Sequence, residues 1–175
     1  MLLLTIPPKF FCEPCSKLID LAENTERCME CLHPCMPCSC TSKGKNFAYT
    51  CPYIGPCKIL ADTKNIIREK DRIQMVGALM TVQYCRLGWP VPDVVLAGSS
   101  SPFTRKLAKH ISTLFEADYL PARKVKKGSL DKNILIIDLL LDREDTLFGL
   151  KKKISPLNAK QTQLLFFTSQ MSSSS

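Results

Sequence analysis

Cysteine spacing constrains the first third of this chain more than any other feature. Nine of the ten cysteines lie between Cys12 and Cys57. They include three Cys-x2-Cys pairs: Cys12/Cys15, Cys28/Cys31 and Cys35/Cys38. Zinc takes four thiolates in a tetrahedron at about 2.3 Å, and two such turns supply that geometry without a hydrophobic core. The spacing therefore predicts a small zinc-ribbon-like module over residues 1–45.

The first two pairs are the predicted zinc ligands, and the third pair provides further candidates. Four protein ligands leave no open coordination position, so the zinc is expected to be structural. A disulfide framework and a cluster of free thiols are the alternatives. A second zinc site is a further possibility, with its pairing left open, from Cys35, Cys38, Cys40, Cys51 and Cys57, with His33 as a substitute ligand.

The remainder of the chain alternates between strand-like and helix-like blocks, which is typical of an α/β domain with a mostly parallel sheet. Strands are predicted at 47–50, 93–97, 133–138 and 163–168. Helices are predicted over 57–86, with a break near Asp71, and again after 143. The α/β domain is expected to span 46–170, followed by a disordered serine tail at 171–175.

A third helix is predicted to begin with Ser101 as N-cap and Pro102 at the first helical position. Its buried stripe is expected to comprise Phe103, Leu107, Ile111, Leu114 and Phe115. His110 is placed on its polar face. In the preceding helical region Ile59 is predicted to be a core residue, as is the isolated Cys85.

Charge and hydropathy limit the partners and the location. The formal net charge is +8, with a pI of about 9.0, which favours nucleic acid or a phosphorylated ligand. Each four-thiolate zinc site would lower this charge by two. The short apolar start before Pro7 is not a secretory signal, and no apolar run is long enough to cross a membrane. A cytoplasmic protein without membrane insertion is expected.

Three segments together resemble the ComF family, in which paired cysteines precede a type I phosphoribosyltransferase fold. The first is the cysteine module, and the second is Phe47-Ala48-Tyr49 with Tyr53-Ile54-Gly55-Pro56 and the Ile-rich helix after it. The third is Ile134 to Leu147, which aligns without a gap on the family's apolar strand, acidic pair and Thr-Thr-Gly-x-Thr loop. The resemblance implies a phosphoribosyltransferase-like α/β domain and an accessory role in DNA uptake.

The resemblance also implies a site for phosphoribosyl pyrophosphate after the 133–138 strand. Asp138 would be the catalytic residue and would bind the ribose hydroxyls. The phosphate loop would be Asp142, Arg143, Glu144, Asp145 and Thr146. The sequence departs from the family here, since Leu139 replaces the second acid and Glu144 the glycine. Acidic residues would repel a phosphate by about 1 to 4 kcal/mol per charge pair.

Three functions remain open from the sequence. The first is a ComF-like protein with a degenerate substrate loop that assists DNA uptake, either binding single-stranded DNA or a DNA-uptake protein. The basic stretches available to DNA are 123–127 and Lys151 to Lys153. The second is an active, magnesium-dependent phosphoribosyltransferase. The third is a zinc-dependent protein-interaction module.

Overall fold

The structure is a computed structural model that describes residues 13–23, 26–30, 40, 45–62, 67–121, 131–142, 144–154 and 159–170. Cys12, Cys31, Cys35, Cys38, His33 and Arg143 lie outside these ranges, as does the predicted serine tail at 171–175. The side chains of Cys15, Glu144 and Asp145 are likewise outside what is described, although their backbone is placed in helices.

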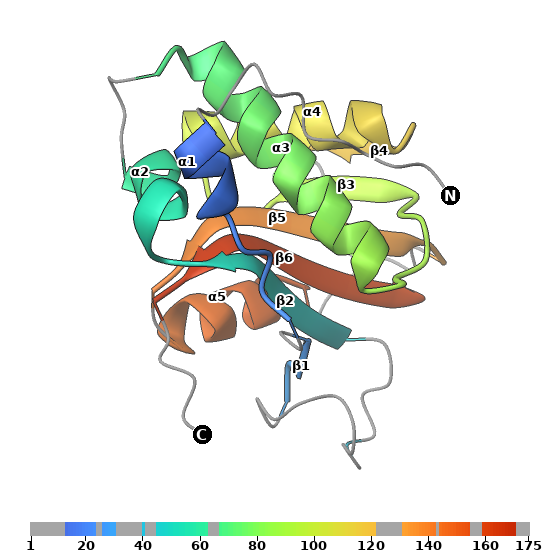
Figure 1. Ribbon diagram of the computed structural model, residues 1–175. Coiled ribbons are helices and arrows are strands. Elements are labelled where there is room, and N and C mark those ends of the chain that lie inside the picture. Colours follow the sequence, from blue (N-terminus) through green and yellow to red (C-terminus); the bar gives the residue numbers. More distant parts are fainter. Residues whose placement is uncertain are drawn as a thin grey trace.

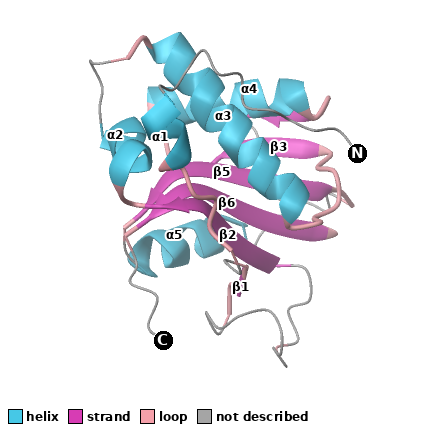
Figure 2. Cartoon of the chain, viewed as in Figure 1, coloured by secondary structure: helices cyan, strands magenta, loops and turns pink. Residues whose placement is uncertain are grey.

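A six-stranded sheet forms the centre of the described chain (Figure 2). In sequence order its strands are β1 (Arg27–Cys28), β2 (Lys45–Pro52), β3 (Val94–Ala97), β4 (Asp118–Leu120), β5 (Asn133–Leu141) and β6 (Gln161–Ser169). Their spatial order is β1-β2-β6-β5-β3-β4. Strand β1 is antiparallel to β2, and all the other pairs are parallel. The carboxyl ends of five strands therefore meet at one edge.

Helices cover the sheet on both faces (Figure 1). They are α1 (Glu13–Lys17), α2 (Gly55–Asp62), α3 (Glu69–Arg86), α4 (Pro102–Leu114) and α5 (Glu144–Ile154). Helices α2, α3 and α4 lie over one face, and α5 lies over the other. The predicted α/β class with a mostly parallel sheet is confirmed, and it is compatible with a phosphoribosyltransferase-like fold.

Burial explains why the central strands are almost wholly apolar. Every side chain from Ile134 to Ile137 of strand β5 is buried, because helices or loops lie on both faces of the strand. Leu135 and Ile137 join the core beneath α3 and α4, while Ile134 and Ile136 join the core on the α5 side. This alternation fixes the register of β5, since a slip by one residue would exchange the two sets.

Helices α3 and α4 pack closely because Gly77 faces His110. A Cβ placed on Gly77 would lie 2.6 Å from His110 Cδ2, so only glycine permits this approach without movement of the ring. His110 is half-buried at this contact, which corrects its predicted place on the polar face of its helix. Burial of the imidazole lowers the pKa of His110 from its ordinary value.

Sequence predictions of burial are wrong at three helical positions. Cys85 lies near the end of α3 and is exposed rather than in the core. Leu114, the last residue of α4, is 47% exposed, and Ile59, in the middle of α2, is 50% exposed. The apolar character of these residues predicted burial, but their side chains face away from the core. The predicted N-cap at Ser101 has the right position, without a side-chain capping bond.

Strands β2, β5 and β6 are longer than the sequence analysis predicts, whereas β3 begins one residue later than predicted. Strand β5 continues beyond Asp138 to Leu141, because the apolar run Leu139 to Leu141 still pairs with β6. The helical break falls between Asp62 and Glu69, slightly before the predicted position at Asp71. Within the residues placed by the structure, no helix combines the length and apolar character needed to cross a bilayer.

Candidate functional site

Asp138 occupies the carboxyl edge of the sheet, where strand β5 lies between β3 and β6. Its neighbour Ile137 pairs with Ala97 of β3, and Asp138 itself pairs with Phe166 of β6. The backbone N–H of Gly98 donates to the carbonyl of Ile137 at 2.8 Å, which brings the β3–α4 turn alongside Asp138. Carboxyl edges of parallel sheets are the usual location of ligand sites in α/β proteins.

The Asp138 carboxylate is directed into the protein, and the residue is only 8% exposed. Its Oδ1 accepts hydrogen bonds from the Leu139 backbone N–H at 2.8 Å and from Ser99 Oγ at 3.1 Å. Thr104 Oγ1 lies 3.5 Å from the same oxygen and 3.0 Å from Ser99 Oγ. Asp138 thus joins β5 to the turn after β3 and to the first turn of α4.

Gly98 permits this close approach. A Cβ at Gly98 would lie 2.8 Å from Asp138 Oδ2 and 3.2 Å from Asp138 Cβ. Any larger residue at position 98 would push the carboxylate aside. The position of Oδ2 therefore leaves no room for a side chain at position 98.

The acidic residues of the predicted phosphate loop begin well beyond Asp138. Three strand residues separate Asp138 from Asp142, and the four residue steps correspond to roughly 13 Å along an extended chain. Asp142 is exposed, and its Oδ1 accepts a hydrogen bond from Thr146 Oγ1 at 2.7 Å. Glu144, Asp145 and Thr146 belong to the first turn of α5. Acidic residues at the N-terminus of a helix interact favourably with the helix dipole, and each stabilises the helix by about 0.3 to 1 kcal/mol.

Ser99 and Thr104 are partners of Asp138 that the sequence analysis does not predict. Ser99 belongs to the serine-rich turn after β3, and Thr104 belongs to the first turn of α4. The signal available was a Gly-Ser turn after one strand and an aspartate near the end of a later strand. That signal required knowing that β5 lies beside β3, which the sequence pattern alone does not establish.

The cysteine module reaches the described structure at Cys28, whose side chain is 4% exposed. The backbone N–H of Glu30, two residues later, points at Cys28 Sγ across 3.4 Å. An N–H donor to sulfur stabilises a thiolate, so this turn suits a zinc ligand. Among the residues placed in the structure no three potential ligands cluster, but four of the six predicted ligands fall elsewhere in the chain.

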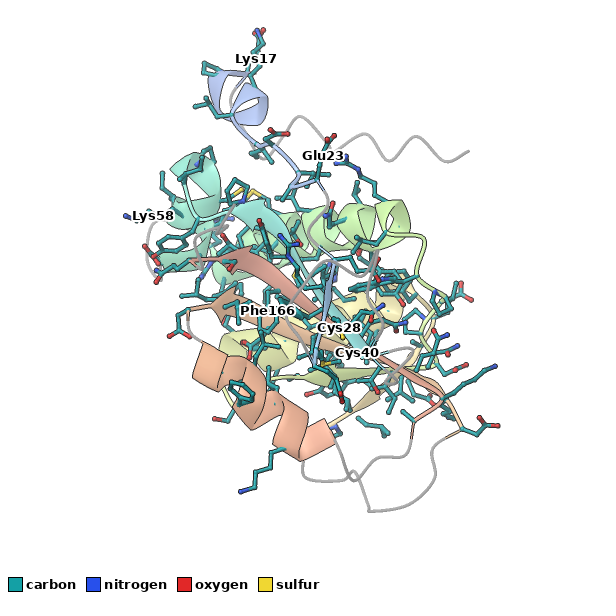
Figure 3. The ribbon with its side chains drawn as sticks, turned by 90° about the horizontal axis from the view of Figure 1, so that it is seen from below. Lys17, Glu23, Cys28, Cys40, Lys58 and Phe166 are labelled. Carbon is teal, nitrogen blue, oxygen red and sulfur yellow. The ribbon has the colours of Figure 1, made fainter. Side chains whose placement is uncertain are left out.

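Cys51 and Cys57 are too far from Cys28 to share a zinc ion with it. Cys28 pairs with Asn46 near the start of β2, whereas Cys51 lies near the carboxyl end of that strand. Five strand residues correspond to roughly 17 Å, while zinc–sulfur bonds measure about 2.3 Å. Figure 3 draws the side chains of Cys28 and Cys40 as labelled sticks. The predicted second zinc site draws on Cys35, Cys38, Cys40, Cys51 and Cys57, of which Cys35 and Cys38 lie outside the described residues, and it stays a prediction.

Glu26 connects the cysteine module to the rest of the protein. Its Oε1 accepts hydrogen bonds from Asn46 Nδ2 at 2.6 Å and from Trp89 Nε1 at 2.8 Å. The pairing of β1 with β2 adds main-chain hydrogen bonds between the same two regions. The described part of the module is thus attached to the sheet rather than separate from it.

The excess of positive charge lies outside the described residues. Of the 24 Lys and Arg residues eight fall there, whereas all 16 Asp and Glu residues are in the described ranges. The described residues therefore hold 16 of each sign and no net formal charge. Four of the eight basic residues are Arg123, Lys124, Lys126 and Lys127. These four residues and Lys151 to Lys153 are the basic runs that a polyanion would be expected to contact.

Comparisons with known proteins add no relative: no family model, no curated protein and no solved structure matches this chain. The fold and the two sites above are therefore the basis for a functional proposal.

Proposed function

We propose that this chain is a ComF-like protein of the phosphoribosyltransferase fold whose sugar-phosphate site has become structural, and that it assists DNA uptake by binding single-stranded DNA. The main support is the position of the Asp138 carboxylate. One oxygen accepts from Ser99 and Leu139, and the other packs against Gly98. A ribose hydroxyl would have to displace these contacts to reach it.

The acidic start of α5 supports the same proposal. Asp142, Glu144 and Asp145 replace the neutral residues that would bind a 5-phosphate in an intact family member. Asp142 is already bonded to Thr146, whose hydroxyl would otherwise be a phosphate donor. Arg143 is the single compensating cation in this stretch. The net repulsion disfavours phosphoribosyl pyrophosphate.

The distribution of charge supports the DNA-binding half of the proposal. Phosphate contacts with Lys and Arg dominate non-specific binding to single strands. Arg123, Lys124, Lys126 and Lys127 fall within five consecutive residues, so the basic stretch 123–127 is the expected contact. The hydrogen bonds of Glu26 to Asn46 and Trp89 join the cysteine module to the α/β domain. They argue against the alternative in which the cysteine module binds a protein partner on its own.

The test compares the affinity for oligo(dT) of two variants with equal loss of charge, across a salt series. One variant replaces the basic stretch with glutamine: Arg123, Lys124, Lys126 and Lys127. The control replaces four exposed basic residues of the body: Lys58, Lys70, Arg105 and Lys109. We expect the first to flatten the salt dependence by about 0.7 per lost phosphate contact, and the control to change it little. Absence of binding by the wild-type protein at low salt would contradict the proposal.

A further inference from the structure

The residues that connect the first two cysteine pairs run beside β2 as an extended segment. We call residues 18–23 and 26–28 the strap. Near the carboxyl end of β2 the Ala22 backbone N–H donates to the Thr50 carbonyl at 2.9 Å. Near the start of β2 Cys28 pairs with Asn46 in antiparallel register. The two ends of the strap therefore lie toward opposite edges of the sheet.

Side-chain contacts hold the strap at both ends. Ile19 and Leu21 pack against the core beneath α3 and α4. Gln83 Nε2 of α3 donates to the Ala22 carbonyl at 2.8 Å. At the other end Glu26 accepts hydrogen bonds from β2 and from the segment after α3. A hairpin in the strap would break the contacts at one end or at both.

Two of the predicted zinc ligands, Cys15 and Cys28, belong to opposite ends of this segment. The four residue steps from Asn46 to Thr50 correspond to roughly 13 Å along β2. Cys15 belongs to α1, and Figure 1 shows α1 at the end of the strap away from β1, on the side of α2. The Cα atoms of Cys15 and Cys28 are therefore more than about 13 Å apart.

One zinc ion cannot take a thiolate from each of two residues at this separation. Zinc–sulfur bonds measure about 2.3 Å, so two sulfurs on one ion lie at most about 4.6 Å apart. With the reach of the side chains, the Cα atoms of two ligands lie within about 10 Å of each other. The described backbone thus does not fit a single site that contains both Cys15 and Cys28, as the cysteine spacing predicts.

We propose that Cys28 binds zinc at the edge where the parallel strands begin, and that Cys15 is not a ligand of the same ion. Twelve residues separate the two cysteines, which is enough for a hairpin, but the burial of Ile19 and Leu21 favours the extended strap. The Glu30 N–H directed at Cys28 Sγ supports a metal-bound thiolate at this end. Zinc then fastens only the Cys28 end of the strap.

Cadmium-113 spectroscopy of the full-length protein tests this proposal. Cadmium replaces zinc at thiolate sites, and its nuclear spin couples to the β protons of each cysteine that binds it. We expect the Cys28 β protons to correlate with a cadmium resonance to which the Cys15 β protons show no correlation. Correlation of both residues with one resonance would overturn the proposal and leave the zinc prediction intact. Absence of any correlation from Cys28 would also overturn it, and the zinc prediction falls too if no cysteine binds the metal.

Serine variants give a second readout through metal content and Trp89 emission. Cys15→Ser should keep the zinc bound by Cys28 and the emission change on chelation, because Glu26, two residues before Cys28, binds the indole. Cys28→Ser should lose both, whereas Cys85→Ser, at an exposed position of α3, should behave as the wild type. Loss of the emission change in a folded Cys15→Ser variant would contradict the proposal. The wild-type cadmium spectrum decides it even if a variant folds poorly.

Discussion

The guanidinium of Arg72 lies over the ring of Phe103, 4.0 Å from its centroid. Arg72 Nε donates to the carbonyl of Leu60, and Nη2 donates to that of Ala61 at 2.7 Å, so one side chain joins α2, α3 and α4. The residue is 5% exposed. The buried last turn of α2 depends on these donors for its carbonyl groups.

Arg72→Ala should therefore destabilise the protein substantially. Two buried carbonyls would lose their partners, and the stacking on Phe103 would be lost with them. We expect a fall of about 2 to 4 kcal/mol in the free energy of unfolding, measured by urea denaturation. Arg72→Lys should recover only part of it, because lysine lacks the planar fork. If Arg72→Lys is as stable as the wild-type protein, the positive charge at position 72 is sufficient and the guanidinium hydrogen bonds are not needed.

Two glycines offer a matched pair of substitutions. Gly77→Ala should destabilise by about 1 to 3 kcal/mol, since its Cβ would overlap His110. Gly149→Ala in α5 has open space within 4 Å and should stabilise by about 0.5 to 1 kcal/mol through helix propensity. Thermal unfolding of both variants checks the pair. The Gly77 cost should largely disappear in Gly77→Ala/His110→Ala.

Acidification should weaken the protein through His110. Its pKa is lowered by burial in the folded state, so below about pH 6.5 the unfolded chain binds a proton that the folded chain does not. Stability is then fully present above that pH and decreases as the pH falls towards the folded pKa. Urea midpoints at about pH 7.5 and 5.5 test this. The His110→Gln variant should lose less stability than the wild-type protein over the same pH interval. If the variant loses as much as the wild type, groups other than His110 cause the acid sensitivity.

Zinc removal should be visible at Trp89, the only tryptophan in the chain. Its indole N–H donates to Glu26, two residues before Cys28. If metal at the module holds the Cys28 turn, chelation should break this bond and change the tryptophan emission. Glu26→Ala should lose most of the change, whereas Glu23→Ala, an exposed neighbour, should keep it. A chelator that extracts no metal and leaves the emission constant would contradict the zinc prediction.

Much of the fold was predictable because it depends on local pattern. The run Ile134 to Ile137 identifies a buried strand, and Pro102 identifies the start of α4, whatever the rest of the chain does. The exposure of Cys85 was not predictable, since periodicity does not show where the supporting sheet ends. The partners of Asp138 required the strand order, because Ser99 and Thr104 lie some 35 to 40 residues away in sequence and meet it only through β3.

The interaction of Gly98 with Asp138 gives a further prediction. Gly98→Ala should destabilise by about 1 to 3 kcal/mol because its Cβ would displace the carboxylate. In a double-mutant cycle with Asp138→Ala, the two losses should be strongly non-additive. If the losses in the free energy of unfolding, measured with urea, are additive, then Gly98 and Asp138 do not interact in the way described here.

Calorimetric titration of the wild-type protein with phosphoribosyl pyrophosphate and magnesium is the most direct test of whether Asp138 has become a structural residue. We predict no saturable heat, together with loss of stability in Asp138→Ala measured on the same preparation. Tight, magnesium-dependent binding that Asp138→Ala abolishes while its unfolding free energy stays unchanged would contradict the account.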